Sequence, residues 1–300
     1  MPLTSTNKQT PTNYVVVLYP CHQLLDSAGP LDILSTITKR PEGANITLTV
    51  AAETLEPVPL APVPPAGVDW EFEDVAELPK AEDGEVGGAG FDVEIRPSVT
   101  FEELLKSLRG RNDGMFEMVD GRGRKVVRSV DVLLIPGGIG TRMFRVPKGG
   151  KGEGGVGERW NNVEGAVKFV KELCEGQWVQ SAVLTVCTGS DLLARTGLLD
   201  GRRATTNVMA FEKVAERNKG VQWQRLRRWV RSLPEEVKGD GKKGFEKEIW
   251  TSAGISAGMD LMLWFVAEIY GKEFAHGIAR RLEYEWRSHI EEGEVDPYYT

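Results

Sequence analysis

The 300-residue sequence contains few cysteines and few histidines, three of each. Because the three cysteines are an odd and sparse set, they argue against a disulfide framework and favour a reducing compartment, so we expect a cytoplasmic protein. The histidines lie far apart along the chain, and no two have the spacing of metal ligands, which argues against a structural zinc site. We therefore expect neither a metal ion nor another cofactor.

Long apolar runs are also missing. No stretch approaches the roughly 18 to 20 apolar residues that span a bilayer, and residues 1–13 are polar, without the apolar core of a secretory signal. The net charge is −7, and residues 69–94 alone hold ten acidic side chains and one basic one. Because an acidic chain binds nucleic acid and anionic membranes poorly, we expect a small-molecule substrate, no nucleic acid and no membrane partner.

Short apolar runs alternate with segments of helical pattern along the chain. Strands are expected at residues 14–19, 46–51, 91–95, 126–135, 182–186, 204–206 and 249–253, and helices at 24–37, 161–175, 190–196, 210–217, 259–270 and 273–286. This alternation predicts an α/β fold with a mainly parallel central sheet and helices on both faces.

A single domain is expected at residues 12–290, with flexible tails at 1–11 and 291–300. Changes in composition predict insertions at about 56–90, 106–128, 143–160 and 233–247, the first of them rich in proline and acidic residues. The third insertion contains a G-x-G-x-x-G pattern at Gly152, Gly154 and Gly157. We do not interpret it as a nucleotide site, because no strand precedes it.

Three expected strand ends, at residues 20–30, 136–142 and 187–190, would meet at one edge of the sheet, where active sites of open α/β sheets gather. Cys187 stands between a buried strand and a helix and is followed by Thr188 and a glycine. A tight turn there would present the sulfur as a nucleophile, and the helix N-terminus would favour its thiolate form. The alternative is a buried, inert thiol.

Four stretches carry a resemblance to a known family: residues 23–30 (QLLDSAGP), 131–142 (DVLLIPGGIGTR), 186–206 (VCTGSDLLARTGLLDGRRATT) and 251–260 (TSAGISAGMD). Together they resemble the ThiJ/PfpI superfamily of class I glutamine amidotransferase-like proteins. The first stretch and the C-T-G-S turn are most similar to the isonitrile hydratase branch. The resemblance implies a flavodoxin-like three-layer sandwich, a homodimer, and a turn cysteine beside an acidic residue.

The resemblance also implies roles for individual residues. Cys187 would be the nucleophile and Asp26 the acid beside it, and Thr188 would supply a hydroxyl and an N–H group. Gly138 would supply a second N–H group to the pocket, with Ile139 and Asn207 also expected to contact the substrate. If the substrate is a carbonyl compound, the N–H groups of Gly138 and Thr188 would hold the developing oxyanion. For Asp26 the alternative is a cap on the helix that starts there.

Asn207 marks a departure from the family pattern, because many superfamily members have histidine at this place. Asparagine cannot act as a base near neutral pH, although it can hydrogen-bond substrate or position water. This weakens a Cys–His–acid hydrolase interpretation and leaves a Cys–Asp mechanism, or a protein that has lost activity.

The expected function is therefore cysteine-dependent hydration of a small isonitrile to an N-substituted formamide. The alternatives are an amidase, deglycase or glyoxalase-like enzyme, or a non-catalytic redox or stress sensor that uses the same cysteine.

Other residues have lesser roles in this interpretation. Cys21 is expected near the pocket mouth, His22 near the entrance and Cys174 in the core, with residues 259–270 as a core or dimer helix. The arginine-rich residues 225–231 are expected to form a solvated surface segment.

Overall fold

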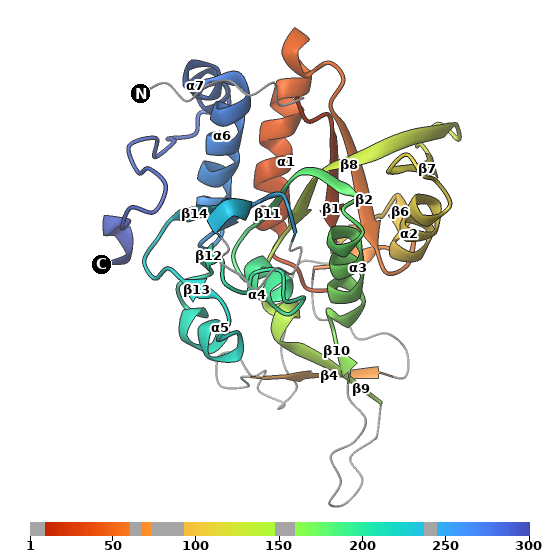
Figure 1. Cartoon of the computed structure of the whole chain (residues 1–300), viewed down its shortest axis with the longest axis horizontal. Helices are drawn as coiled ribbons and strands as arrows, with labels where there is room; N and C mark the ends of the chain where they lie inside the picture. The colour runs from red at the N-terminus through yellow and green to blue at the C-terminus, as the bar shows by residue number, and fades with distance from the viewer. Residues whose placement is uncertain (1–9, 61–67, 74–92, 148–159, 237–244) are drawn as a thin grey trace, which may run out of the picture.

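The computed structural model describes residues 10–60, 68–73, 93–147, 160–236 and 245–300. The strands of its central sheet are β1 (Asn13–Val17), β2 (Thr47–Ala52), β6 (Val99–Thr100), β7 (Met115–Val119), β8 (Lys125–Ile135), β11 (Val179–Thr185), β14 (Trp229–Ser232) and β15 (Glu248–Ser252). Among the described residues these eight strands have the order β14-β15-β11-β8-β1-β2-β6, and β7 also pairs with β8 (Figure 1). All neighbours are parallel except β14 with β15 and β7 with β8.

Helices cover both faces of the sheet. On one face lie α1 (Leu24–Thr38), α6 (Ser256–Tyr270) and α7 (Lys272–Arg281), and on the other lie α2 (Phe101–Arg109), α3 (Glu164–Glu175) and α4 (Gly189–Ala194) (Figure 1). Strand β1 has apolar side chains on both faces of the sheet, and each face packs into its own core. Val15 and Val17 lie in one core, and Tyr14 and Val16 lie in the other. A strand buried on both faces is apolar throughout, as a parallel sheet requires. The predicted three-layer α/β fold is confirmed.

Helix α2 and strand β7 are among the elements that lie where sequence analysis placed no helix or strand. Helix α2 begins with a capping box in which the Thr100 hydroxyl accepts from the Glu103 N–H, while the Glu103 carboxylate accepts from the Thr100 N–H. Strand β7 then pairs with the first half of β8. Both lie partly or wholly within the expected insertion at 106–128, so that segment extends the main sheet and its helical layer.

Smaller strands surround the central sheet. Strands β4 (Val68–Phe72), β9 (Met143–Pro147) and β10 (Trp160–Asn161) form a second sheet at the bottom of Figure 1. Two short pairs join β3 (Val58–Pro59) to β5 (Glu94–Ile95) and β12 (Arg203–Ala204) to β13 (Gln222–Trp223). The glycine pattern at 152–157 and most of the acidic run lie outside the described residues.

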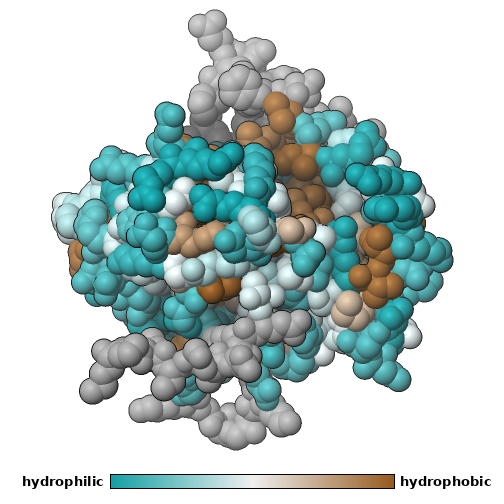
Figure 2. Space-filling model, turned by 90° about the horizontal axis from the view of Figure 1, so that it is seen from above, coloured by the Kyte–Doolittle hydropathy of each residue, from teal (hydrophilic) through white to brown (hydrophobic). Residues whose placement is uncertain are grey.

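Within the described residues the remaining helical elements are α5 (Phe211–Arg217) and the short 3-10 turns η1 (Pro41–Gly43), η3 (Ile139–Arg142), η4 (Pro234–Glu236) and η5 (Pro297–Tyr299). Helix α7 ends at Arg281, five residues before the expected end at 286. Seen from above, the surface is mainly hydrophilic, with apolar patches between the polar side chains (Figure 2). None of the described helices combines the length and apolar character that crossing a membrane requires.

Candidate active site

Cys187 occupies a strained turn between β11 and α4. Its φ of 57° lies in the left-handed region, which a residue with a side chain adopts at a cost of roughly 1 to 2 kcal/mol. Its N–H donates to the carbonyls of Ser252 and Ala253, 3.2 and 3.1 Å away, and these bonds hold the strained backbone. Gly189 completes the turn, because a Cβ there would lie 2.3 Å from the Ile135 carbonyl oxygen. The local sequence therefore forms the tight strand-to-helix turn that its pattern predicts.

The thiol of Cys187 is protonated at neutral pH. Burial, and then the negative charge of Asp26, raise the pKa of Cys187 to about 12. Hydrogen bonds from the Thr188 N–H and the Asn207 side chain act in the opposite direction but do not compensate. The expectation that the helix N-terminus would favour the thiolate was wrong, since α4 has only six residues and the sulfur is almost fully buried.

Asp26 lies fully buried within the first turn of α1. Its Oδ2 accepts a hydrogen bond of 3.0 Å from the Gly137 N–H, and its carboxyl group also interacts with the Cys187 thiol. The other carboxyl oxygen has no nitrogen or oxygen partner among the described residues. The alternative of a helix cap was wrong, because Gln23 is the N-cap residue and no side chain caps this end.

Burial controls the protonation of this carboxyl group. Desolvation raises the pKa of Asp26 from 3.8 to about 7, and the hydrogen bonds from Gly137 and Cys187 only partly offset it. At neutral pH Asp26 is therefore poised between acid and carboxylate, the condition that suits a group which accepts and returns a proton.

A pocket of about 190 Å³ opens onto the sulfur. It is lined by Gln23, Gly138, Ile139, Arg142, Cys187, Thr188, Asn207 and Ile255. Of the six residues given catalytic or substrate-contact roles from the sequence, only Asp26 is outside this lining, and it lies behind it against the thiol.

Three lining residues were not proposed from sequence: Gln23, Arg142 and Ile255. Each lies within one of the four stretches that carry the family resemblance. Their position in those stretches was the available signal, but only the folded chain shows which of many residues there face the pocket.

Both N–H groups expected to hold an oxyanion already have partners. The Gly138 N–H donates to Thr188 Oγ1 at 3.0 Å, and that hydroxyl lies 3.0 Å from the Gly138 carbonyl oxygen, to which it donates. The Thr188 N–H is directed to the Cys187 sulfur. The arrangement thus links the two walls of the pocket and leaves neither group as a ready oxyanion donor.

Asn207 is oriented by its own backbone contacts. Its Oδ1 accepts from the N–H groups of Met209 and Ala210 at 2.9 and 3.1 Å, so its amide nitrogen is left to donate to the Cys187 sulfur. Asn207 therefore holds the sulfur in place and takes no proton from it.

The other candidate residues, His22 and Cys21, do not line the pocket that contains Cys187. His22 is buried away from the pocket entrance, with Nδ1 3.1 Å from the Tyr19 carbonyl oxygen, and burial lowers its pKa to about 4. Cys21 is buried beside Ile139 and Met143 and does not line the pocket. Cys174 lies in the core as predicted, and no described group of three or more potential ligands is arranged to hold a metal ion.

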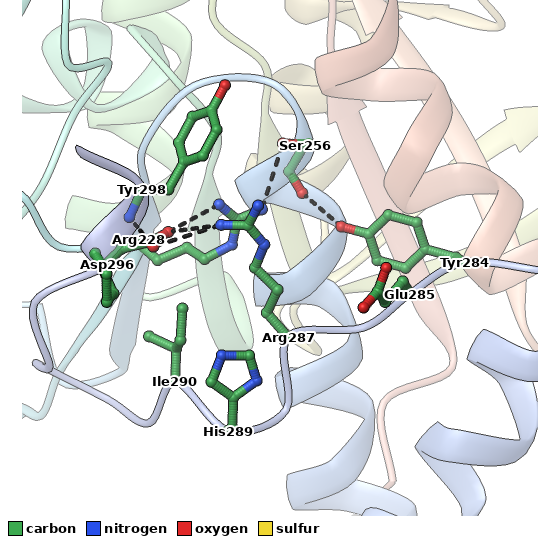
Figure 3. A pocket seen from close by; sticks show the side chains of 10 residues that line it. Arg228, Ser256, Tyr284, Glu285, Arg287, His289, Ile290, Asp296 and Tyr298 are labelled. Carbon is green, nitrogen blue, oxygen red and sulfur yellow. Dashed lines mark hydrogen bonds and ion pairs between the residues drawn. The ribbon is translucent and has the colours of Figure 1, made fainter. Parts of the chain in front are cut away.

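A second cavity, of about 400 Å³, lies beside the first, because Ser256 lines it and Ile255 lines the pocket with the thiol (Figure 3). At its wall Arg228 forms ion pairs with Asp260 and Asp296, and all three side chains are buried. The expectation of a solvated segment at 225–231 was wrong for Arg228, which is buried directly before edge strand β14 and pairs with two buried carboxylates.

Part of the chain is similar to a known protein family. Residues 152–268 match the sequence profile of the DJ-1/PfpI family. This match covers less than half of the chain, so it shows that this part of the chain is similar to the family.

The sequence is distantly similar to isonitrile hydratase from Pseudomonas putida. It is 28% identical over 156 residues, which are 52% of this chain and 52% of the relative, so the chain spans about half the length of the curated relative it matches. A ThiJ/PfpI family protein from Pseudomonas syringae has a similar fold, with a TM-score of 0.51 and 18% identity over 95% of this chain and 82% of that one. DJ-1beta from Drosophila melanogaster matches with a TM-score of 0.50 and 16% identity, over 92% and 99% of the two chains. These structures support the DJ-1/PfpI fold for the chain.

Proposed function

We propose that this protein hydrates a small isonitrile to an N-substituted formamide, with Cys187 as nucleophile and Asp26 as proton carrier. The observation that carries the proposal is the contact between a buried thiol and a buried carboxyl group at a pocket of about 190 Å³. The named function of the Pseudomonas putida relative agrees with it.

The proton balance follows from the two pKa values. Because the pKa of Cys187 is raised to about 12 and that of Asp26 to about 7, the thiol keeps its proton until substrate arrives. As the sulfur bonds to the isonitrile carbon, its proton passes to the Asp26 carboxylate and from there to that carbon. The product of this step is a thioimidate, in which the carbon carries sulfur, hydrogen and the double-bonded nitrogen.

Water completes the reaction. It adds to the thioimidate carbon, the nitrogen takes a proton, and the carbon–sulfur bond breaks with return of a proton to the thiol. The net change is one isonitrile plus one water to one formamide. Asn207 would hold the sulfur, and Asp26 would carry the proton between steps.

The N–H groups of Gly138 and Thr188 favour hydration over acyl transfer, because both already have hydrogen-bond partners. Acyl transfer needs free donors at a developing oxyanion, but Gly138 and Thr188 use theirs on the Thr188 hydroxyl and the Cys187 sulfur. Addition to an isonitrile places negative charge on carbon, where a proton donor serves better than an oxyanion site. The raised pKa of Cys187 also disfavours a peroxide sensor, because the thiolate is the form that oxidises.

A direct assay tests this function. Ethyl isocyanide and methylglyoxal are each incubated with the wild type, Cys187→Ala, Asp26→Asn and, as a control, Cys174→Ala, and products are identified by NMR. We expect N-ethylformamide from the wild type and the control, none from Cys187→Ala, and at least a hundredfold lower rate from Asp26→Asn. Formamide production by Cys187→Ala at the wild-type rate would refute the nucleophile, and turnover of methylglyoxal alone would favour the glyoxalase-like alternative.

A further inference from the structure

Ile255 lies at the opening of the pocket that contains Cys187. Among the residues of this lining, Cys187 and Thr188 are buried and form the floor, whereas Gln23 and Ile255 are exposed and lie at the mouth. The Ile255 side chain is 38% exposed, although an aliphatic side chain gains most from burial. Its position is therefore not explained by packing into the core.

The backbone of Ile255 has a conformation that residues with branched side chains rarely adopt. Its φ is 43° and its ψ is −89°. This combination lies outside the regions that steric contacts allow, and a β-branched residue at positive φ is an outlier. Such a conformation costs stability and is found mainly at functional sites, where the surrounding structure maintains it. Glycine would adopt it at lower cost.

Hydrogen bonds on both sides of Ile255 maintain this conformation. Before it, the Ala253 N–H donates to the Arg228 carbonyl oxygen at 2.9 Å. After it, the Ser256 hydroxyl accepts from Arg228 Nη2 at 3.3 Å, and the Tyr284 hydroxyl donates to the Ser256 carbonyl oxygen at 3.2 Å (Figure 3). Because Arg228 is itself buried and ion-paired, the turn that carries Ile255 has a fixed position at the pocket mouth.

The shape of an isonitrile determines which part of it would meet Ile255. The group is linear, so a molecule whose carbon contacts the Cys187 sulfur at the floor directs its substituent toward the mouth. A pocket volume of about 190 Å³ corresponds to roughly six water molecules, which leaves room for a substituent of few atoms. The side chain beside that substituent therefore limits its size.

We propose that Ile255 determines which isonitriles the pocket accepts, and that its strained backbone is retained because it holds the side chain beside the substituent. A small apolar substituent fits against Ile255, and a bulky one is excluded by it. This inference rests on the proposed function for the reacting group, whereas the position and strain of Ile255 are independent of the reaction.

The experiment compares kcat/KM for ethyl isocyanide and cyclohexyl isocyanide in the wild type, Ile255→Val, Ile255→Gly and Gln177→Gly. Cyclohexyl isocyanide exceeds ethyl isocyanide by as many carbon atoms as Ile255→Gly removes. Gln177 is the matched control, because it also has a positive φ, of 54°, but is exposed and outside the lining.

We expect the wild type and Gln177→Gly to show the same preference for the ethyl compound. In Ile255→Gly this preference should fall at least tenfold, mainly through a higher kcat/KM for the cyclohexyl compound, and Ile255→Val should lie between. Both glycine variants should unfold at a urea concentration no lower than the wild type, because glycine relieves the strain. An unchanged preference in Ile255→Gly would refute the selection, and a clearly lower unfolding midpoint would refute the strain.

Binding without chemistry separates this inference from the proposed function. N-ethylformamide and N-cyclohexylformamide, the two products, are titrated calorimetrically into Cys187→Ala and into Cys187→Ala with Ile255→Gly. If the second variant gains affinity for the cyclohexyl product while the wild type turns over neither isonitrile, selection by Ile255 is supported and hydration is refuted. If the wild type turns over isonitriles but Ile255→Gly changes neither the preference nor the binding, selection is refuted and hydration stands.

Discussion

Replacing Asp26 by asparagine should remove a charge that the folded protein accommodates at a cost. The native pKa of about 7 lies above the ordinary 3.8, so the folded state holds this proton more tightly than the unfolded state does. Protonation therefore stabilises the fold at low pH, and this stability is lost as pH rises from about 4 to about 7. At higher pH the cost is about 4 kcal/mol.

The substitution keeps the local structure while it removes the titration. The side-chain oxygen of asparagine can still accept from the Gly137 N–H, the bond that Asp26 Oδ2 makes. Between pH 5 and pH 8 the free energy of unfolding of Asp26→Asn should therefore rise relative to the wild type by about 3 kcal/mol. Comparing the same pair at two pH values cancels effects of the substitution that do not depend on pH.

Urea unfolding at pH 5, 6, 7 and 8, followed by circular dichroism, measures this difference. Asp120→Asn is the control, because hydrogen bonds to the backbone and side chain of Arg124 lower the pKa of Asp120 to about 2. Its carboxyl group is ionised in both states throughout this range, so its variant should run parallel to the wild type. A constant difference between Asp26→Asn and the wild type across the range would refute the raised pKa and, with it, the proton-carrier role.

Three further results are expected. In the wild type, kcat/KM for isonitrile hydration should rise from pH 5 to pH 8 with an apparent pKa of about 7, because only ionised Asp26 accepts the thiol proton; a flat profile would contradict this. Gly137→Ala should abolish turnover, since its Cβ would lie 2.4 Å from the Thr188 nitrogen, whereas Gly121→Ala, with nothing within 4 Å, should match the wild type in the same assay. Arg228→Met should lower the free energy of unfolding by about 3 to 5 kcal/mol, because it leaves the buried Asp260 without its cationic partner and Asp296 with Arg287 alone. Arg225→Met, at an exposed ion pair, should change it by about 0.5 kcal/mol or less, and equal effects of the two substitutions in urea unfolding would count against the buried network.

Local pattern was enough to predict the layers of the fold. The β-branched run around Val15 and the alternation of strands with helices predicted a parallel sheet covered on both faces, because such patterns act over a few neighbouring residues. Helix α2 was missed although Phe101, Leu104, Leu105 and Leu108 have helical spacing. The segment was interpreted as an insertion, and its pairing with the main sheet through β7 depends on β8, which follows it in the chain.

Arg228 shows the limit of composition as a guide to exposure. A segment with four arginines resembles solvated surface. Arg228 is nevertheless buried, because it lies directly before β14, which pairs with β15 in the central sheet. Its partners Asp260 and Asp296 lie 32 and 68 residues further along the chain, so no local sequence pattern predicts these ion pairs. Only the folded arrangement distinguishes the buried Arg228 from the exposed Arg225 of the same segment.

The sequence by itself determined that Cys187 would stand at a tight turn between a buried strand and a helix, because that turn depends on a few adjacent residues. The tertiary structure alone decided the protonation of its sulfur and its contact with Asp26. The physical reason is that desolvation and charge act through space, and the groups that exert them here come from helices, strands and turns spread over most of the chain.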